Sequence, residues 1–478
     1  MNPYATLDEL GAMLRAKEFS SLELTRFYLD RLEKLGPKLN AVVTITRERA
    51  EVEAKRADAE IAAGRTQNRP LLGIPYGVKD LLATKGIPTT WGAEPYRNQV
   101  FDYDATVVNK LTEAGAVLCA KLAMVELAGG FGYNNADASF TGPGKTPWNT
   151  DFWSGGSSSG PGAAVGAALV PFAIGSETSG SILTPSAFSG VTGLRPTYGA
   201  VSRHGAMACA WTLDKLGPMC RTAADCNSVL HAISGEDPND PTTIGVYVSG
   251  RATFIANSMM RDHPRKLRIG IIKGSHEKVQ KEVRENFFRS IDVLRGQGHT
   301  IVEDLAWTEL PVSATVGVIV DAEAASAFED LIRSGETKTL REANDRIGGF
   351  EAAATLAVDY LRAQRIRAMI RRELLAIFDK VDLNVDLIAA PTRSTVAYPL
   401  DRNFDEAYKG VSGGPSLISG MNLAGAPAIS LPNGLGENGL PTAMQLIAAP
   451  ANEIALLNAA VNFQAATNDH KKVPRGFE

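Results

Sequence analysis

The sequence predicts an α/β protein in which helices cover both faces of a sheet. Its 478 residues suffice for one large domain. From residue 72 onward, short apolar runs alternate with segments of helical periodicity, which is the pattern of strands and helices in turn. No Gly/Ser-rich or Pro-rich linker and no internal repeat interrupts the alternation. We therefore expect one domain with an inserted middle segment rather than two domains.

The N-terminal 5–65 segment is predicted to be helical, with a break at Gly36 and Pro37. Side-chain oxygens at helix starts accept hydrogen bonds from the free N–H groups of the first turn. Candidate N-caps are Thr6 or Asp8 for the first helix and Ser20 or Ser21 for the second.

The next elements alternate between strand and helix. Asp104 and Gly115 are suited to begin and end a helix, and Pro161 to open one. We expect a strand at 72–80, a helix at 104–116, a strand at 116–121 and a helix at 161–170.

The rest of the chain begins with its most loop-like stretch, residues 236–265. Beyond it we expect a strand at 266–274, helices at 276–297 and 317–380, strands at 386–392, 426–432 and 441–449, and a helix at 452–467.

Composition and charge are ordinary for a soluble globular protein. The chain is 44% hydrophobic and 21% charged, with a formal net charge of −4, so charge gives no reason to expect nucleic acid or membrane as a partner. The N-terminus lacks a signal-peptide pattern, and long apolar runs such as 163–175 are broken by glycine and proline. A cytoplasmic protein is predicted, with its four cysteines reduced and buried.

Two short motifs nearly match known sites. Residues 139–146 resemble a phosphate-binding loop, but Ser139 replaces its first glycine and a proline follows where a helix must begin. Residues 156–160 fit the G-x-S-x-G nucleophile elbow around Ser158, but no apolar strand precedes them, and His470 in a polar tail is the candidate base. The six histidines show no metal-binding spacing, so neither a metal nor a cofactor is expected.

A lysine and two serine-glycine loops form a more specific pattern. Lys79 ends the apolar 72–80 strand, where burial would disfavour its charge. In an arbitrary protein, such a lysine reaches solvent or pairs with its neighbour Asp80. The loops at 154–162 and 176–186 each precede a helix start, where free backbone N–H groups can bind an anion. Together they indicate hydroxyl chemistry with a lysine base.

These residues resemble the amidase signature family, whose hallmark is a Ser-Ser-Lys catalytic group. The matching segments are "GGSSSG" (155–160), "GSETSGSIL" (175–183), "GVTGLRPTYGAVSRHG" (190–205), "TLDKLGP" (212–218), "GIPYGVKD" (73–80) and "NLAGAPAISLP" (422–432). The resemblance implies a single large α/β/α domain over 1–478, with a mixed twisted sheet covered on both faces. It would divide into a catalytic core at 66–235, a variable inserted segment at 236–385 and a C-terminal return to the sheet at 386–478.

The family's catalytic residues fall on Lys79, Ser157 and Ser181 of this chain. Lys79 would be the base, Ser157 the bridging serine behind a cis Gly156–Ser157 peptide, and Ser181 the nucleophile that forms an acyl-enzyme. The oxyanion would be bound by the backbone N–H groups of Thr178, Ser179, Gly180 and Ser181.

Position 183 informs the expected substrate. Leu183 replaces a frequent arginine of the family, which would be a bidentate clamp for a substrate carboxylate. Apolar residues near the motifs include residues 207–211, Leu127, Phe131 and Phe140, although they are equally well explained as core. We therefore expect a small-molecule substrate with a neutral, aryl or apolar amide, with carbamate (urethane) and ester bonds as further candidates.

The alternative is a glutamine-hydrolysing A-type subunit of a tRNA-dependent amidotransferase. The first interpretation implies a stand-alone monomer or homodimer with neither nucleic acid nor membrane as partner. The alternative implies partner subunits and tRNA.

Overall fold

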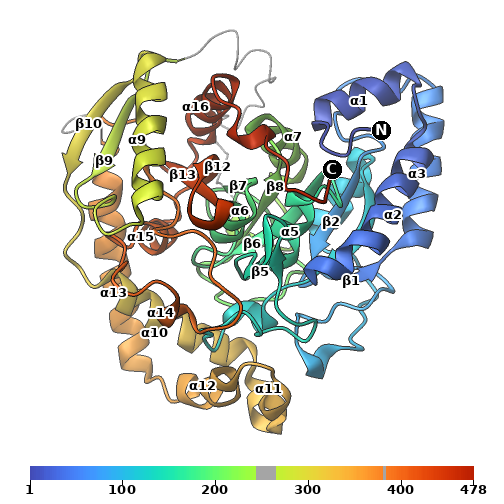
Figure 1. The fold of residues 1–478 in the computed structure, drawn as a ribbon. Coiled ribbons are helices and arrows are strands. Elements are labelled where there is room, and N and C mark those ends of the chain that lie inside the picture. Colours follow the sequence, from blue (N-terminus) through green and yellow to red (C-terminus); the bar gives the residue numbers. More distant parts are fainter. Residues whose placement is uncertain (244–264, 380–383) are drawn as a thin grey trace.

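A mixed sheet of eleven strands runs through the molecule (Figure 1). The computed structural model describes residues 1–243, 265–379 and 384–478. In spatial order the strands are β1 (Val42–Ile45), β3 (Val117–Leu122), β2 (Pro75–Lys79), β6 (Phe172–Glu177), β8 (Lys215–Cys220), β7 (Thr192–Arg195), β12 (Ala428–Leu435), β13 (Pro441–Ala448), β11 (Leu387–Pro391), β9 (Arg268–Ile272) and β10 (Thr300–Leu305).

Parallel and antiparallel pairs are combined in this sheet. The pairs β2–β3, β2–β6, β9–β11 and β9–β10 are parallel, and the remaining neighbours are antiparallel. The central strands are buried on both faces, as expected where helices cover each side. A separate hairpin is formed by β4 (Lys145–Thr146) and β5 (Asn149–Trp153).

Helices cover both faces of the sheet. Side chains of one face form a core with α1 (Leu7–Ala16), α4 (Thr106–Ala114), α7 (Ala223–Ile233), α9 (Lys281–Gly296) and α16 (Glu453–Ala465). The opposite face packs against α2 (Ser21–Leu39), α3 (Arg47–Ala62), α5 (Ser159–Gly166), α6 (Leu183–Ser189), α13 (Ala357–Ala376) and α15 (Leu417–Ala424). We call the core on the first of these faces the first core and the core on the opposite face the second core. Successive residues of β6 show this division, because the side chains of Phe172 and Ile174 pack in the first core and that of Ala173 packs in the second core.

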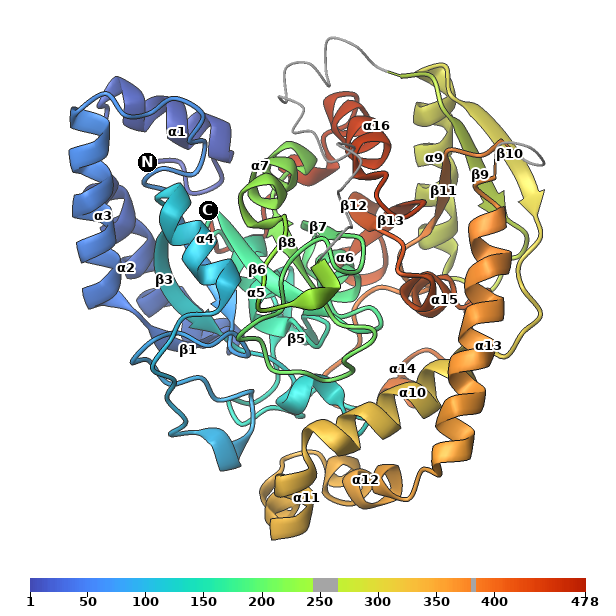
Figure 2. The same cartoon turned by 180° about the vertical axis from the view of Figure 1, so that it is seen from behind.

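The remaining helices lie in the lower part of the molecule in Figure 2, with α11 and α12 at its edge. They are α10 (Val312–Ala327), α11 (Glu329–Ser334), α12 (Ala343–Ala353) and the short α14 (Phe404–Ala407). Of these, α10 packs against α13 and α15, which places it beside the second core. None of the helices that the structure describes is both long and apolar enough to cross a membrane.

The predicted fold class is confirmed, and the six predicted strands are present as β2, β3, β9, β11, β12 and β13. The strands β1, β4, β5, β6, β7, β8 and β10 were not predicted. Two N-caps are Thr6 and Ser20, each in a reciprocal capping box with a glutamate. The predicted break at Gly36 and Pro37 is wrong, because α2 continues to Leu39. Pro37 lies in the last turn, where loss of one backbone hydrogen bond costs little.

Other boundaries differ from the predictions. The predicted helical 5–65 segment also contains the edge strand β1. The single helix expected at 317–380 is instead divided among α10, α11, α12 and α13. Most of the predicted 236–265 loop, residue 380 and His263 lie outside the described residues. The proposed division at residues 236 and 385 stays a prediction.

Candidate active site

Lys79 ends β2 with its side chain fully buried. Its Nζ lies 2.7 Å from Ser157 Oγ and 2.8 Å from Ser176 Oγ. The neighbouring Asp80 pairs instead with the buried Lys121, at 2.9 Å. Lys79 therefore neither reaches solvent nor pairs with Asp80, the two ordinary explanations of a strand-end lysine.

Burial lowers the pKa of Lys79 to about 7, although Cys209, Asp214 and Glu177 oppose this shift. An ammonium group loses its hydration when it is buried, and two neutral hydroxyls replace that hydration incompletely. Near neutral pH, a large fraction of Lys79 is therefore an uncharged amine that is able to accept a proton.

Ser157 precedes α5 and is fully buried. The Gly156–Ser157 peptide is cis, as the family resemblance implied. The next residue joins the two serine-glycine loops, because Ser158 N–H donates to the Ser181 carbonyl at 3.3 Å. The Ser158 hydroxyl donates to the Ser176 carbonyl at 3.2 Å, so this side chain supports the loop from within.

Ser181 lies in the turn between β6 and α6, with 8% of its surface exposed. Gly180 takes a φ of +99°, which favours glycine at this position. In the described part of the chain, the backbone N–H groups of Thr178, Ser179, Gly180 and Ser181 donate to no other protein group. This turn therefore presents free donors beside the Ser181 hydroxyl.

Glu177 fixes the Ser181 turn through four hydrogen bonds. Its carboxylate accepts hydrogen bonds from the backbone N–H groups of Ile182 and Leu183 at 2.9 and 3.0 Å. It also accepts from Arg195 Nη1 and Asn422 Nδ2, both at 2.8 Å. Burial alone would raise the pKa of Glu177, but the Arg195 charge and these hydrogen bonds hold it below its ordinary value. Glu177 is thus an ionised anchor for α6.

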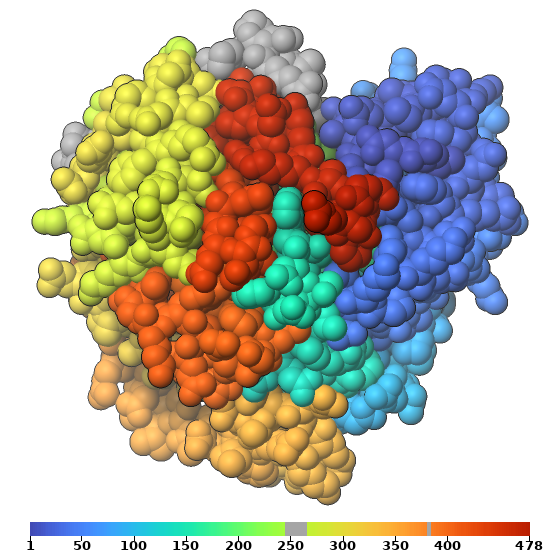
Figure 3. All heavy atoms as spheres, in the orientation of Figure 1, coloured from blue at the N-terminus to red at the C-terminus, as the bar shows by residue number. Residues whose placement is uncertain are grey.

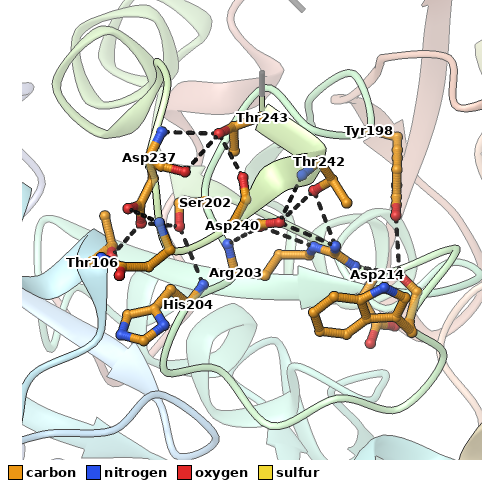
Figure 4. A network of polar contacts seen from close by, with 12 residues as sticks. Thr106, Tyr198, Ser202, Arg203, His204, Asp214, Asp237, Asp240, Thr242 and Thr243 are labelled. Carbon is orange, nitrogen blue, oxygen red and sulfur yellow. Dashed lines mark hydrogen bonds and ion pairs between the residues drawn. The ribbon is translucent and has the colours of Figure 1, made fainter. Parts of the chain in front are cut away.

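Thr178 is fixed from the opposite side by Asp214. Thr178 Oγ1 donates to Asp214 Oδ1 at 2.6 Å, and Asp214 Oδ2 accepts from the Cys209 and Ala210 N–H groups at 2.8 and 3.0 Å. Figure 4 shows Asp214 beside a network of polar contacts around Arg203 and Asp240. There Arg203 pairs with Asp240 and lies over the Trp211 ring at 4.6 Å.

Ser181 opens into a cavity of about 340 Å³. Its walls combine aromatic rings, hydroxyls and one arginine, Arg393, from the segment that follows β11. The lining residues are Ala128, Gly129, Tyr133, Trp153, Gly156, Thr178, Ser179, Ser181, Thr184, Cys209, Val320, Arg393, Tyr398 and Phe404. No Asp or Glu is among these described lining residues, so Arg393 supplies the charge of the wall.

Leu183 does not contact this cavity, contrary to its predicted substrate-binding position. It begins α6 and is fully buried in the second core, among residues of α13 and α15. Leu127 and Phe131 belong to the first core, as their alternative interpretation held. The absence of charge at position 183 therefore says nothing about the charge of the substrate.

Two residues of the site were not predicted from the sequence. Ser176 precedes the turn in the same motif, yet only the strand geometry shows that its hydroxyl reaches Lys79. Arg393 lies 212 residues beyond Ser181 in a segment without a recognised motif. The elbow hypothesis has no support, since His470 is not among the described residues that line the cavity.

The mixed sheet and the buried lysine beside two serine-glycine loops are the features that the family resemblance implied. The amidase family model matches residues 23–457. The chain belongs to the amidase (amidase signature) family, and it is a hydrolase of carbon–nitrogen bonds other than peptide bonds.

Relatives and solved structures resemble the chain over nearly its full length. It is 37% identical to the A-type subunit of the glutamyl-tRNA(Gln) amidotransferase of Halorhodospira halophila, over 99% of both chains. It is 38% identical to the protein of the same name from Methylococcus capsulatus, again over 99% of both. The peptide amidase of Stenotrophomonas maltophilia is 28% identical with a TM-score of 0.86, covering 100% of this chain and 99% of that one.

These relatives correct two predictions. The neutral aryl or apolar amide, with its carbamate and ester variants, is wrong as the main interpretation, because curated relatives at 37–38% identity are named as amidotransferase subunits. The prediction of a stand-alone monomer or homodimer without nucleic acid is contradicted by the same names. The argument for a neutral substrate depended on Leu183, which packs in the core rather than against substrate.

Proposed function

We propose that the chain hydrolyses the side-chain carboxamide of glutamine and passes the ammonia to partner subunits of a tRNA-dependent amidotransferase. The observation that carries the proposal is the Lys79–Ser157 contact at 2.7 Å, next to a cavity that Ser181 lines. The full-length relatives named as amidotransferase subunits of the A type support glutamine as the amide. An enzyme of this kind works where aminoacyl-tRNA is used, in agreement with the predicted cytoplasmic location.

In the first step, Ser181 Oγ attacks the carboxamide carbon. Its proton passes to Ser157 Oγ, while the Ser157 proton passes to the neutral Lys79 amine. A hydroxyl without such a base is a poor nucleophile, so the lowered pKa of Lys79 is what enables the step. The oxygen of the tetrahedral intermediate becomes negative and accepts hydrogen bonds from the free N–H groups of residues 178–181. One such donor contributes roughly 10²–10³ in rate.

In the second step, the carbon–nitrogen bond breaks. The proton returns from Lys79 through Ser157 to the departing nitrogen, which leaves as ammonia. The glutamyl group stays as an ester on Ser181, and water then attacks this ester by the same relay. The products are glutamate and ammonia, and the enzyme regains its starting protonation.

The proposal is tested by measuring glutamate release from glutamine by the purified chain. The same protein is then combined with the remaining subunits of the Methylococcus capsulatus amidotransferase, and glutamine-dependent amidation of Glu-tRNA(Gln) is measured. We expect glutamate release in at least one of these assays, and we expect Ser181→Ala to abolish it. Absence of both activities from the wild-type chain would overturn the proposal.

Covalent labelling identifies the nucleophile independently of the substrate. A fluorophosphonate should label the wild-type chain and Ser158→Ala on Ser181, and it should leave Ser181→Ala unlabelled. Labelling of Ser181→Ala together with loss of labelling in Ser158→Ala would transfer the role to Ser158.

A further inference from the structure

Arg393 is the single charged residue that lines the cavity of Ser181 in the described chain. Its Nη2 donates to the Tyr398 hydroxyl at 3.1 Å, and its guanidinium lies 5.9 Å from the Phe188 ring centroid. Its Nε is buried and has no hydrogen-bond partner. No described acidic side chain forms an ion pair with Arg393, so its charge is left uncompensated by the protein.

A second buried donor of the same wall is also unpaired. Trp153 is 3% exposed, lines the cavity, and its Nε1 has no partner. An unpaired buried donor costs free energy, more so when it belongs to a charged group. Both donors belong to residues that line a cavity without a described carboxylate, and such a wall favours an anionic ligand.

Arg393 also lines a second, polar cavity of about 220 Å³. The two cavities adjoin at a hydroxyl pair as well, because Ser179 Oγ and Ser419 Oγ lie 3.0 Å apart. The second cavity contains the unpaired buried oxygens Ser275 Oγ and Gln445 Oε1. It likewise has no Asp or Glu among its described lining residues. A substrate that extends away from Ser181 therefore meets Arg393 and then hydroxyl groups.

We infer that Arg393 binds a carboxylate on the acyl part of the substrate. It would thus take the role that the family's arginine at position 183 has in its other members and that Leu183 does not provide here. The inference rests on the proposed function and deepens it, since the glutamyl group carries such a carboxylate. An arginine offers parallel N–H donors to a carboxylate, and Arg393 lines the cavity with no described acidic partner. The substrate class is an ω-carboxamide that carries a carboxylate at its other end.

The test compares glutaramate with pentanamide, two amides of equal chain length that differ in the carboxylate. The wild-type chain should prefer glutaramate in kcat/KM. Arg393→Met should lower the glutaramate-to-pentanamide ratio by at least about tenfold, mainly through a higher KM for glutaramate, because the charge pair is lost. Arg393→Lys should recover part of the ratio. The control is Arg402→Met, which removes an exposed arginine paired with Asp401 and should leave the ratio unchanged.

A second readout needs no turnover. Glutarate should slow fluorophosphonate labelling of Ser181 in the wild-type chain, and Arg393→Met should require at least about tenfold more glutarate for the same protection. Equal protection of both proteins, or an unchanged substrate ratio, would overturn the role of Arg393.

The two proposals fail in different ways. Preference for glutaramate without any hydrolysis of glutamine would refute the proposed function and leave Arg393 as the carboxylate-binding residue. Hydrolysis of glutamine with an Arg393→Met ratio equal to that of the wild type would refute Arg393 alone.

Discussion

At the scale of single residues, the amine of Lys79 combines complete burial with two hydroxyl contacts. A carboxylate at hydrogen-bond distance would have opposed the effect of burial, as Asp80 does for Lys121, whose pKa burial lowers and the Asp80 charge raises. The two lysines lie in different surroundings. Lys121 forms a buried ion pair with Asp80, whereas Lys79 has no such partner among the described residues and a pKa of about 7. Lysines on neighbouring strands thus acquire different chemistry from the groups that surround them.

The pH dependence of turnover follows from this pKa. The active form has a neutral Lys79, so kcat/KM should rise with pH along an acid limb centred near the Lys79 pKa of about 7. The measurement is a pH profile of glutaramate hydrolysis in buffers of constant ionic strength. A rate that stays constant between about pH 5 and 9 would contradict a lysine base with this pKa.

The stability of the protein should respond in the same pH range. The pKa of Lys79 is about 7 in the folded protein and has its ordinary value of 10.5 in the unfolded chain, so the unfolded chain binds more protons between these values. The free energy of unfolding therefore rises with pH across this window. Lys79→Met should be more stable than the wild type at pH 7, with the difference shrinking toward pH 10, as measured by urea unfolding. The exposed Lys281→Met is the control, and a destabilised Lys79→Met would contradict the argument.

Ser176 is expected to act as a positioning residue for Lys79. Its hydroxyl accepts a hydrogen bond from Lys79 Nζ, which favours the charged amine, so Ser176→Ala should lower the Lys79 pKa further. We expect the acid limb of the pH profile to move to lower pH, with kcat reduced by about tenfold or more. The buried Ser290→Ala, in α9, is the matched control. An unmoved limb would assign Ser176 a merely structural role.

At the scale of elements, α6 depends on a buried charge pair. Glu177 joins three elements, because it accepts from the first turn of α6, from Arg195 of β7 and from Asn422 of α15. A buried pair contributes little net stability as a whole, but removal of one partner leaves the other charge uncompensated. The position of the Ser181 turn therefore depends on both members.

Glu177→Gln should lower the free energy of unfolding by about 3–5 kcal/mol, because Arg195 would remain buried and charged. The double variant Glu177→Gln/Arg195→Met should regain part of this loss, which separates the charge effect from the lost capping of α6. Both are measured by urea unfolding at pH 7. Additive losses in the double variant would contradict the proposed coupling.

At the scale of the whole molecule, the C-terminal segment joins the N-terminal helices. Figure 3 shows it against the first helices, and the carbonyl of Phe477 accepts from Arg31 Nη2 at 2.6 Å and from Tyr4 Oη at 3.0 Å. The ring of Phe477 packs in the core that α2 and α5 share. Contacts more than 440 residues apart in sequence therefore close this end of the sheet.

Phe477→Ala should cost about 3–5 kcal/mol in the free energy of unfolding, since it removes a ring that is 5% exposed. Val473→Ala, at a 36% exposed position nearby, should cost far less. Thermal or urea unfolding distinguishes the two variants. Equal losses would show that the ring contributes no more than its exposed neighbour.

The sequence by itself determined the fold class, six of the thirteen described strands and the residues to be tested as catalytic. Alternating apolar runs indicate buried strands wherever local pattern and burial agree, and the two serine-glycine loops are short contiguous motifs that need no tertiary information. The corrected boundaries, such as α2 continuing through Pro37, arise because packing overrides a local signal of modest strength.

Only the tertiary structure decided the surroundings of each side chain. The pKa of Lys79 depends on its burial and on groups such as Asp214 and Glu177, which other segments supply. The orientation of Leu183 depends on how α6 packs against α15. Four strands (β8, β7, β12 and β13) separate β11 from β6 in the sheet, yet Arg393, in the segment after β11, lines the Ser181 cavity. Burial and charge in a site come from residues brought together by long-range packing, which a local motif does not encode.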